Sequence, residues 1–211
     1  GACEEAGVGV VTGDTKVVPR GSGGGIYLNT AGLGEMTCAA SLDPAGMEVG
    51  DRLILSGPIG SHGIAVLAAR EGLPVGRTVV SDCANLFPAC DRLYALGDHL
   101  KIMRDATRGG VAAVTNELVE DTELSFSIDE ASTPVQGEVA AAAGTLGLNP
   151  LEIANEGVFL AVVSADRADE AIMLLREVAP CESARIVGEV RKEPAGRVVL
   201  ETRIGGRIPI N

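Results

Sequence analysis

From residue 51 onward, short apolar runs alternate with stretches in which apolar residues recur every three or four positions. A short apolar run bounded by turn residues is typical of a buried strand, and the longer spacing is typical of an amphipathic helix. We expect strands at residues 52–56, 124–128, 158–163, 186–190 and 198–201, and helices at residues 64–71, 85–96, 110–120, 138–146 and 168–179. This alternation predicts an α/β or α+β fold, in which helices cover a sheet.

The composition agrees with that class. Aromatic residues make up only 2% of the chain while 46% of it is hydrophobic, so the core has to be built from Val, Ile, Leu and Ala. Such a core suits a sheet covered by helices better than an aromatic-rich sandwich. A length of 211 residues allows one full domain and a portion of another.

The first 45 residues have a different pattern. We expect a strand at residues 8–12, a β-rich run continuing to Val18, a glycine-rich connection at 19–25 and a returning strand at 26–31. Residues 38–50 contain Pro44 and several turn residues, as a linker does. The predicted domains are therefore residues 1–45, rich in β structure, and residues 46–211.

Charge and cysteine usage exclude several classes of partner. A net charge of −12 repels nucleic acid and anionic membranes. The five cysteines form no C-x-x-C pair and only two histidines accompany them, which argues against structural zinc and favours reduced thiols in the cytoplasm. We expect no leader, and no apolar run reaches about 18 residues, the length of a membrane span.

The first of three polar segments is residues 12–16. Asp14 and Lys16 are two positions apart, so in a strand they project to the same face. Asp14 could hold a metal ion, and Lys16 could bind phosphate or act as a base if it is partly desolvated. The alternative is an ordinary turn with a surface ion pair.

The second segment is residues 105–110, which lead into an expected amphipathic helix. Gly109 and Gly110 at a helix N-terminus expose backbone donors where the helix dipole favours an anion, and Arg108 can add a bidentate contact. The alternative is a simple cap in which Thr107 caps the helix and Arg108 is solvated.

The third segment, residues 155–157, precedes an apolar strand. Glu156 beside a buried strand could accept or relay a proton, or it could lie in a solvated turn. Two other features are set aside. Residues 57–63 lack the ending of a P-loop, and His62 within them is interpreted as a helix-start residue instead of a metal ligand. Cys83, beside Asp82, is not expected to be a nucleophile, because no histidine lies near it in sequence.

Taken together, these segments resemble the HypE family, the hydrogenase-maturation branch of the superfamily that includes aminoimidazole ribonucleotide synthetase. The matching stretches occur in family order along nearly the whole chain: 11–18 (VTGDTKVV), 29–34 (NTAGLG), 56–63 (SGPIGSHG), 81–84 (SDCA), 105–111 (DATRGGV), 154–157 (ANEG) and 186–190 (IVGEV).

The resemblance implies a PurM-like fold with an N-terminal domain that binds ATP and Mg²⁺ and forms a homodimer, and a C-terminal domain with a mixed sheet covered by helices. It implies ATP-dependent dehydration of an S-carboxamide, carried on a C-terminal cysteine, to a thiocyanate that supplies the cyanide ligands of nickel–iron hydrogenases. The implied partners are a HypF-type carbamoyltransferase and a HypC–HypD complex.

The resemblance also implies roles for individual residues. Lys16 would be the catalytic base, with Glu156 as its proton relay, and Asp14 would hold the magnesium ion of the nucleotide. The remaining residues expected at the nucleotide are Thr15, Asp82, Asp105, Thr107, Arg108, Gly109, Gly110 and Asn155.

Two departures from the family pattern lead to further expectations. Family members have a long stretch before the position of Gly1 and a tail with the reactive cysteine, whereas no cysteine follows Cys181 here. We expect an inactive fragment cut short at both ends, whose strands in residues 1–36 pair with a second copy. The alternatives are a related enzyme of the thiamine-monophosphate kinase or selenophosphate synthetase type, and a non-catalytic scaffold that docks maturation factors.

Overall fold

The structure is a computed structural model that describes residues 1–22, 25–35 and 41–210. The chain separates into two compact units, residues 1–38 and residues 39–211. The predicted domain boundary between residues 45 and 46 stays a prediction. Part of the expected linker, residues 38–40, and part of the glycine-rich connection, residues 23–24, lie outside the described residues.

The larger unit is built on a mixed sheet of seven strands in the order β2-β4-β1-β5-β3-β6-β7. Neighbouring strands are antiparallel except for β3 and β6, which are parallel. The strands are β1 (Arg52–Leu55), β2 (Leu100–Asp105), β3 (Ser125–Asp129), β4 (Phe159–Val163), β5 (Arg185–Arg191), β6 (Arg197–Glu201) and β7 (Arg207–Ile210).

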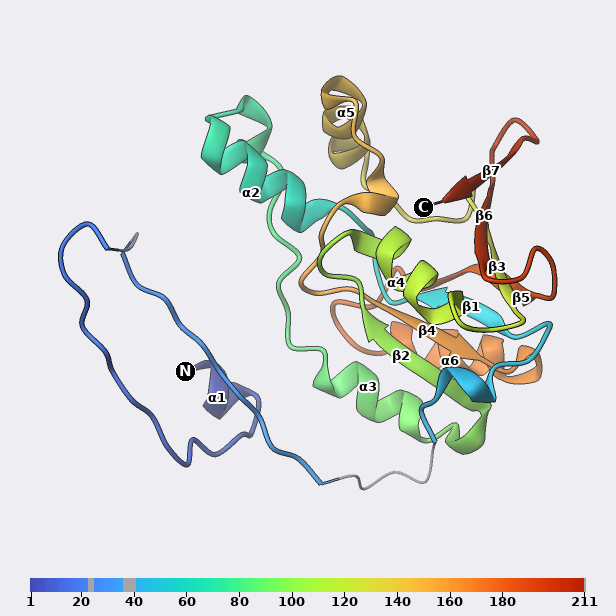
Figure 1. Ribbon diagram of the computed structural model, residues 1–211, viewed down its shortest axis with the longest axis horizontal. Helices are drawn as coiled ribbons and strands as arrows, with labels where there is room; N and C mark the ends of the chain where they lie inside the picture. Colours follow the sequence, from blue (N-terminus) through green and yellow to red (C-terminus); the bar gives the residue numbers. More distant parts are fainter. Residues whose placement is uncertain (23–24, 36–40, 211) are drawn as a thin grey trace. The chain divides into compact units, whose positions relative to one another are not determined.

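Helices cover both faces of this sheet (Figure 1). Because strand side chains alternate between faces, Leu53 and Leu55 of β1 pack in one buried cluster while Ile54 packs in another. Helix α4 (Gly110–Val119) contributes to the first cluster, and helices α3 (Phe87–Tyr94) and α6 (Ala168–Arg176) contribute to the second. The predicted fold class, a mixed sheet covered by helices, is confirmed.

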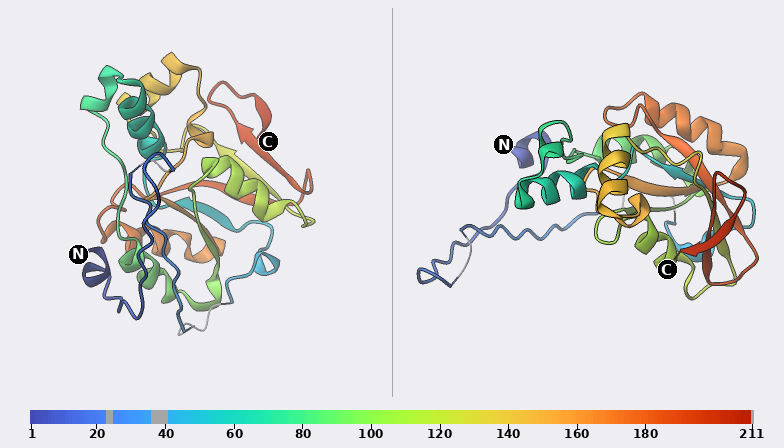
Figure 2. Two further views of the ribbon diagram at one scale, coloured as in Figure 1. Left: turned by 60° about the vertical axis from the view of Figure 1, so that its left-hand side comes forward. Right: turned by 90° about the horizontal axis from the view of Figure 1, so that it is seen from above.

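Two further helices form a smaller layer beside the sheet. Helices α2 (Ser61–Glu71) and α5 (Gly137–Leu146) lie side by side in each view (Figure 2). They share a third buried cluster that includes Ile64, Val139 and Ile153. Short 3₁₀ helices connect the larger elements: η1 (Pro44–Gly46), η2 (Pro74–Arg77), η3 (Gly97–His99), η4 (Pro150–Glu152) and η5 (Ala165–Arg167). None of the described helices is long and apolar enough to cross a bilayer.

The sequence-based expectations missed two strands, and both are at edges of the sheet. Strand β2 pairs only with β4, and its outward positions carry polar residues such as Lys101 and Arg104, which hide the apolar pattern. Strand β7 contains Pro209, which would remove a hydrogen bond from a central strand but is tolerated at an edge. Helix α2 begins at Ser61, three residues before the expected start, because Gly60 adopts the left-handed conformation and caps the helix there.

The expectations for the smaller unit were wrong in their secondary structure. Among its described residues, 1–22 and 25–35, the only regular element is helix α1 (Ala2–Glu5), and none of the strands expected at 8–12, up to Val18 or at 26–31 is formed. Strand propensity alone does not make a strand, since each backbone donor and acceptor also needs a ladder partner. Valines of this unit, among them Val11 and Val17, are exposed.

Candidate functional site

The carboxylate of Asp82 holds together two segments that are far apart in the sequence. Its Oδ1 accepts hydrogen bonds from the backbone N–H groups of Glu156 (2.7 Å) and Gly157 (3.0 Å), and its Oδ2 accepts one from His62 (3.2 Å). Backbone packing is equally close, since a side chain at Gly157 would overlap the carbonyl group of Asp82. The predicted segments around Asp82 and Glu156 are therefore brought together, and Glu156 is left exposed on a fixed backbone.

Asn155 connects the same segment to two others. Its side chain is fully buried, its Oδ1 accepts from the N–H of Gly60 (2.7 Å), and its Nδ2 donates to the carbonyl oxygens of Ala106 (2.8 Å) and Ile153 (3.0 Å). The N–H of Asn155 also donates to Ala106 (3.1 Å). The amide donors and acceptor are thus already used within the chain, so the contacts of Asn155 are those of a residue that positions the site.

The turn before α4 has the backbone geometry expected of an anion-binding site. Gly109 and Gly110 have φ angles of +73° and +62°, and a Cβ at Gly110 would lie 2.5 Å from the carbonyl oxygen of Leu151. No side chain caps this helix, which corrects the alternative in which Thr107 serves as the cap: its hydroxyl donates instead to Asp105 (3.3 Å). Arg108 is exposed. Uncapped donors at the helix N-terminus beside an exposed guanidinium can accommodate a phosphate.

The segment with Asp14, Thr15 and Lys16 belongs to the smaller unit. All three residues are exposed, and the N–H of Thr15 donates to Oδ1 of Asp14 (2.8 Å). The expected meeting of Lys16 with Glu156 stays a prediction. The described residues contain no group of three or more His, Cys, Asp or Glu side chains that could hold a metal ion.

Two residues that the sequence analysis set aside, or did not single out, lie at this site. His62 is in the first turn of α2, as expected of a helix-start residue, and its Nδ1 is 2.9 Å from the Oγ of Ser81. Its Nε2 is 3.9 Å from Oε1 of Glu156. Their separation in the sequence concealed this arrangement, and the only available signal was that each occurs in one of the polar segments between predicted elements.

A cavity of about 300 Å³ lies next to Asp82 and Gly157. It is lined mainly by backbone and by small or polar side chains: Gly57, Pro58, Ser61, Thr78, Val80, Ser81, Asp82, Gln136, Gly157, Val158 and Pro180. Because this lining contains no cationic side chain, the cavity suits a neutral polar group better than a phosphate.

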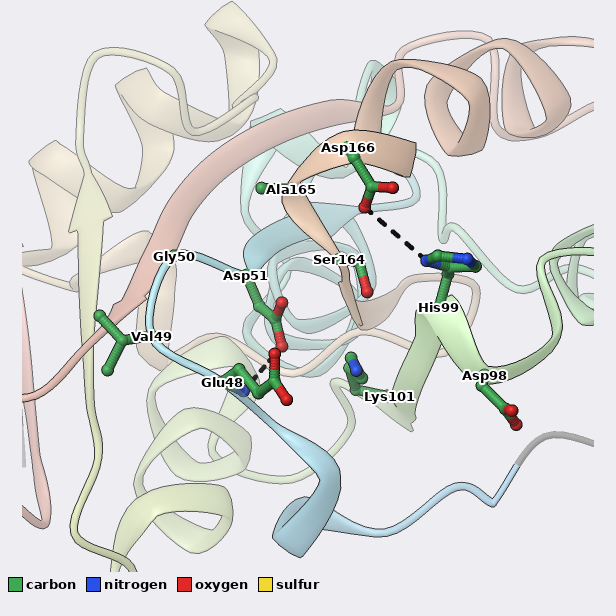
Figure 3. A pocket seen from close by; sticks show the side chains of 10 residues that line it. All are labelled: Glu48, Val49, Gly50, Asp51, Asp98, His99, Lys101, Ser164, Ala165 and Asp166. Atoms are coloured by element: carbon green, nitrogen blue, oxygen red, sulfur yellow. Dashed lines mark hydrogen bonds and ion pairs between the residues drawn. The ribbon is translucent and has the colours of Figure 1, made fainter.

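A larger cavity, of about 510 Å³, lies elsewhere in this unit (Figure 3). It is lined by Asp51, His99, Lys101 and Asp166 among others, and none of the predicted site residues contributes to it. Burial raises the pKa of Asp51, while a hydrogen bond from the N–H of Glu48 and the charge of Lys101 oppose that increase. Size alone therefore does not identify the functional site.

Comparison with known proteins assigns the larger unit to a protein family. The family model for the AIR synthase related protein, C-terminal domain, matches residues 48–201. The chain belongs to this family. The unit that contains Asp82, the Gly109–Gly110 turn and Glu156 is therefore the part of the chain that the family model covers.

Within the family, the chain is similar to HypE proteins, which confirms the resemblance drawn from the motifs. It is 41% identical over 206 residues to "Carbamoyl dehydratase HypE" of Rhizobium leguminosarum bv. viciae and 39% identical over 206 residues to the protein of the same name from Cupriavidus necator. These matches cover 97% and 98% of this chain, whereas the chain spans only 59% of the length of either relative.

Solved structures agree with this placement. A crystal structure of hydrogenase maturation protein HypE matches with a TM-score of 0.87 and 34% identity, and the match covers 100% of this chain and 67% of the HypE chain. A HypE structure in complex with ATP matches with a TM-score of 0.86 and the same identity, over 100% of this chain and 64% of that HypE chain. A thiamine monophosphate kinase is only 17% identical with a TM-score of 0.54, which shows a shared fold and no more.

Proposed function

We propose that this chain carries part of the active site of an ATP-dependent carbamoyl dehydratase that converts an S-carboxamide into a thiocyanate for hydrogenase maturation. The observation that carries the proposal is the convergence on one side of the larger unit: Asp82 holds the backbone of Glu156, and Asn155 joins that segment to the turn before Gly109 and Gly110. The backbone that carries the exposed Glu156 side chain is thereby connected to the segment that leads into the turn before α4.

The reaction needs these two features together. When bound, ATP supplies the phosphoryl group that turns the amide oxygen into a leaving group. Lys16, as the base, takes a proton from the carboxamide nitrogen and passes it to the Glu156 carboxylate, so that the C≡N bond can form as phosphate leaves. Backbone N–H groups at the start of α4, with Arg108, stabilise the charge on the phosphoryl oxygens.

The turn before α4 offers the phosphates of a nucleotide backbone N–H groups without a side-chain cap and the exposed Arg108. A side chain at Gly110 would collide with the carbonyl groups of Leu151 and Ile153, so this backbone is held in a conformation open only to glycine. Asp105 is exposed at the end of β2, beside the turn. We assign the nucleotide to this turn and to Asp14, Thr15 and Asp82, with Mg²⁺ at Asp14, and the ATP complex of a HypE relative supports the choice of nucleotide.

The test uses the chain extended at both ends to the length of its relatives. Glu156→Gln removes the proton acceptor but keeps the hydrogen bonds that Asp82 accepts from the backbone. We therefore expect thiocyanate formation to fall by about 100-fold or more while binding of Mg-ATP, measured by calorimetry, is unchanged. Glu123→Gln, at an exposed position, is the matched control and should retain full activity. Normal dehydration by the Glu156 variant would refute the assigned role.

The proposed partners follow from the same assignment. We propose a HypF-type carbamoyltransferase as the donor, which the crystal structure of a HypE–HypF complex supports, and a HypC–HypD complex as the acceptor of the cyano group, all in the cytoplasm. We also propose a homodimer, in which the exposed apolar residues of the smaller unit pair with a second copy. A strictly monomeric mass in sedimentation would count against the dimer.

The competing proposal is a scaffold that docks these partners without catalysis. It predicts that the extended chain binds the HypF-type protein yet forms no thiocyanate, with or without ATP. A kinase acting on another substrate has only fold-level support from structures such as that of thiamine monophosphate kinase. Incubation with ATP and a labelled carbamoyl donor separates the dehydratase from both alternatives, because only the dehydratase converts the label to thiocyanate.

A further inference from the structure

His62 lies between a serine and the candidate proton acceptor. Its ring is 23% exposed, with Nδ1 2.9 Å from Ser81 Oγ on one side and Nε2 3.9 Å from Glu156 Oε1 on the other. The ring belongs to α2, and the two side chains belong to separate loops, so three segments contribute to one row of polar groups.

The backbone around His62 is closely packed against the Glu156 segment. The N–H of Gly63 donates to the carbonyl oxygen of Ala154 (3.0 Å), and a side chain at Gly63 would overlap Ile153. The N–H of His62 itself donates to Asp82, which also accepts from the N–H of Glu156. Asp82 thus fixes the start of α2 and the Glu156 backbone relative to each other, so the two side chains project from neighbouring backbone segments.

Donor and acceptor chemistry sets the orientation of the neutral ring. Ser81 Oγ already accepts from the N–H of Cys83 (3.2 Å), and its own proton is free to be donated to Nδ1 of His62. In the neutral form whose Nδ1 accepts from Ser81, the single ring N–H is on Nε2, the nitrogen that faces Glu156, and a carboxylate can accept from it. The separation of 3.9 Å exceeds a direct hydrogen bond, but catalytic contacts are often long before substrate binds and shorten afterwards.

We infer that His62 is a positioning residue of this site: Ser81 fixes its ring, and its Nε2–H orients the Glu156 carboxylate for accepting a proton. The inference rests on the proposed function for the role of Glu156, while the contact itself rests on the geometry alone. The step that His62 serves is the transfer from the Lys16 ammonium group to the carboxylate, which leaves the amine neutral and the acid protonated.

Two substitutions at His62 distinguish its two sides. In the extended chain, His62→Gln keeps an amide N–H near the position of Nε2, whereas His62→Asn keeps a polar group only near Nδ1, facing Ser81. We expect His62→Asn to lower kcat for thiocyanate formation by up to about 100-fold with KM for Mg-ATP unchanged, and His62→Gln to restore most of the rate. Rescue by Asn instead of Gln, or equal losses in both, would overturn the inference.

The chain supplies its own control. His99 and Asp166 form a second histidine–carboxylate pair at 3.7 Å, away from the predicted site. His99→Gln should leave kcat unchanged. Because His62 and His99 are the only two histidines, their ring nitrogens are readily assigned by NMR in the ¹⁵N-histidine-labelled 211-residue chain.

The NMR measurement tests the contact without the reaction. At one fixed pH, Glu156→Gln should shift the Nε2 resonance of His62 and leave His99 unmoved. Asp166→Asn should shift the Nδ1 resonance of His99 and leave His62 unmoved. If the His62 Nε2 resonance does not shift in Glu156→Gln, the inference is overturned, whatever the enzyme assays show. If that resonance responds but the extended wild-type chain forms no thiocyanate, the contact is upheld and the proposed function is the part that fails.

Discussion

Asn155→Ala should be among the most damaging single substitutions in the larger unit. The side chain is fully buried, and its amide makes three hydrogen bonds, to Gly60, Ala106 and Ile153. In the variant the N–H of Gly60 loses its partner inside the protein, and an unsatisfied buried donor costs about 1–3 kcal/mol. The Ala106 carbonyl keeps its bond from the N–H of residue 155, so it adds little.

The remaining costs raise the total. The carbonyl of Ile153 loses one donor, and the space vacated by the amide adds a small cavity, for about 1–2 kcal/mol more. We therefore expect the free energy of unfolding to fall by about 3–4 kcal/mol. At roughly 2–4 °C per kcal/mol for a chain of this size, Tm should fall by about 10 °C.

Urea denaturation followed by circular dichroism, together with calorimetry, measures both quantities. The matched control is Asn149→Ala, which removes an exposed side chain that accepts from the N–H of Leu151 (3.1 Å) and should cost about 1 kcal/mol. Asn155→Asp keeps the size of the side chain but replaces the NH₂ group, which donates to two carbonyl oxygens, with an oxygen that can only accept. It should therefore not rescue stability at neutral pH. A loss for Asn155→Ala no larger than that of the control would refute the reasoning.

Two further predictions concern the turn before α4 and the buried carboxyl group of Asp51. Gly110→Ala should cost about 3 kcal/mol or more in urea denaturation, because the φ angle is +62° and the new Cβ would lie 2.5 Å from a carbonyl oxygen. Gly72→Ala, with a similar φ of +65° but open space, should cost only about 1 kcal/mol, and equal losses would exclude the collision as the cause. The raised pKa of Asp51 means that its stability contribution is present below the unfolded-state pKa and is lost as pH rises through the folded-state pKa. Asp51→Asn can still accept from the N–H of Glu48 but does not titrate. Its Tm relative to that of wild type should therefore increase as the pH is raised from about 4 to about 7, and parallel curves of Tm against pH would contradict this.

The central strands could be predicted from the sequence because their patterns are unambiguous. Residues 159–163 are buried without exception, and the apolar run that covers them in the sequence is typical of a strand covered on both faces. The edge strands β2 and β7 could not be predicted in this way, since an edge strand needs only a weak apolar pattern and tolerates Pro209. The failure at residues 8–31 has the opposite cause: the pattern is strong, but the described residues there have no ladder partner.

For the candidate site, too, some features follow from the local sequence and others only from the tertiary structure. By itself the sequence determined the family, the mixed sheet covered by helices, and the polar segments around Asp82, Gly109 and Glu156, because those depend on local pattern and residue type. Only the tertiary structure decided that Asp82 holds the Glu156 backbone, that Asn155 is committed to its own chain, and that His62 lies beside Glu156. Such contacts join residues up to 95 positions apart, and nothing in either segment alone specifies which partner the folded sheet will bring to it.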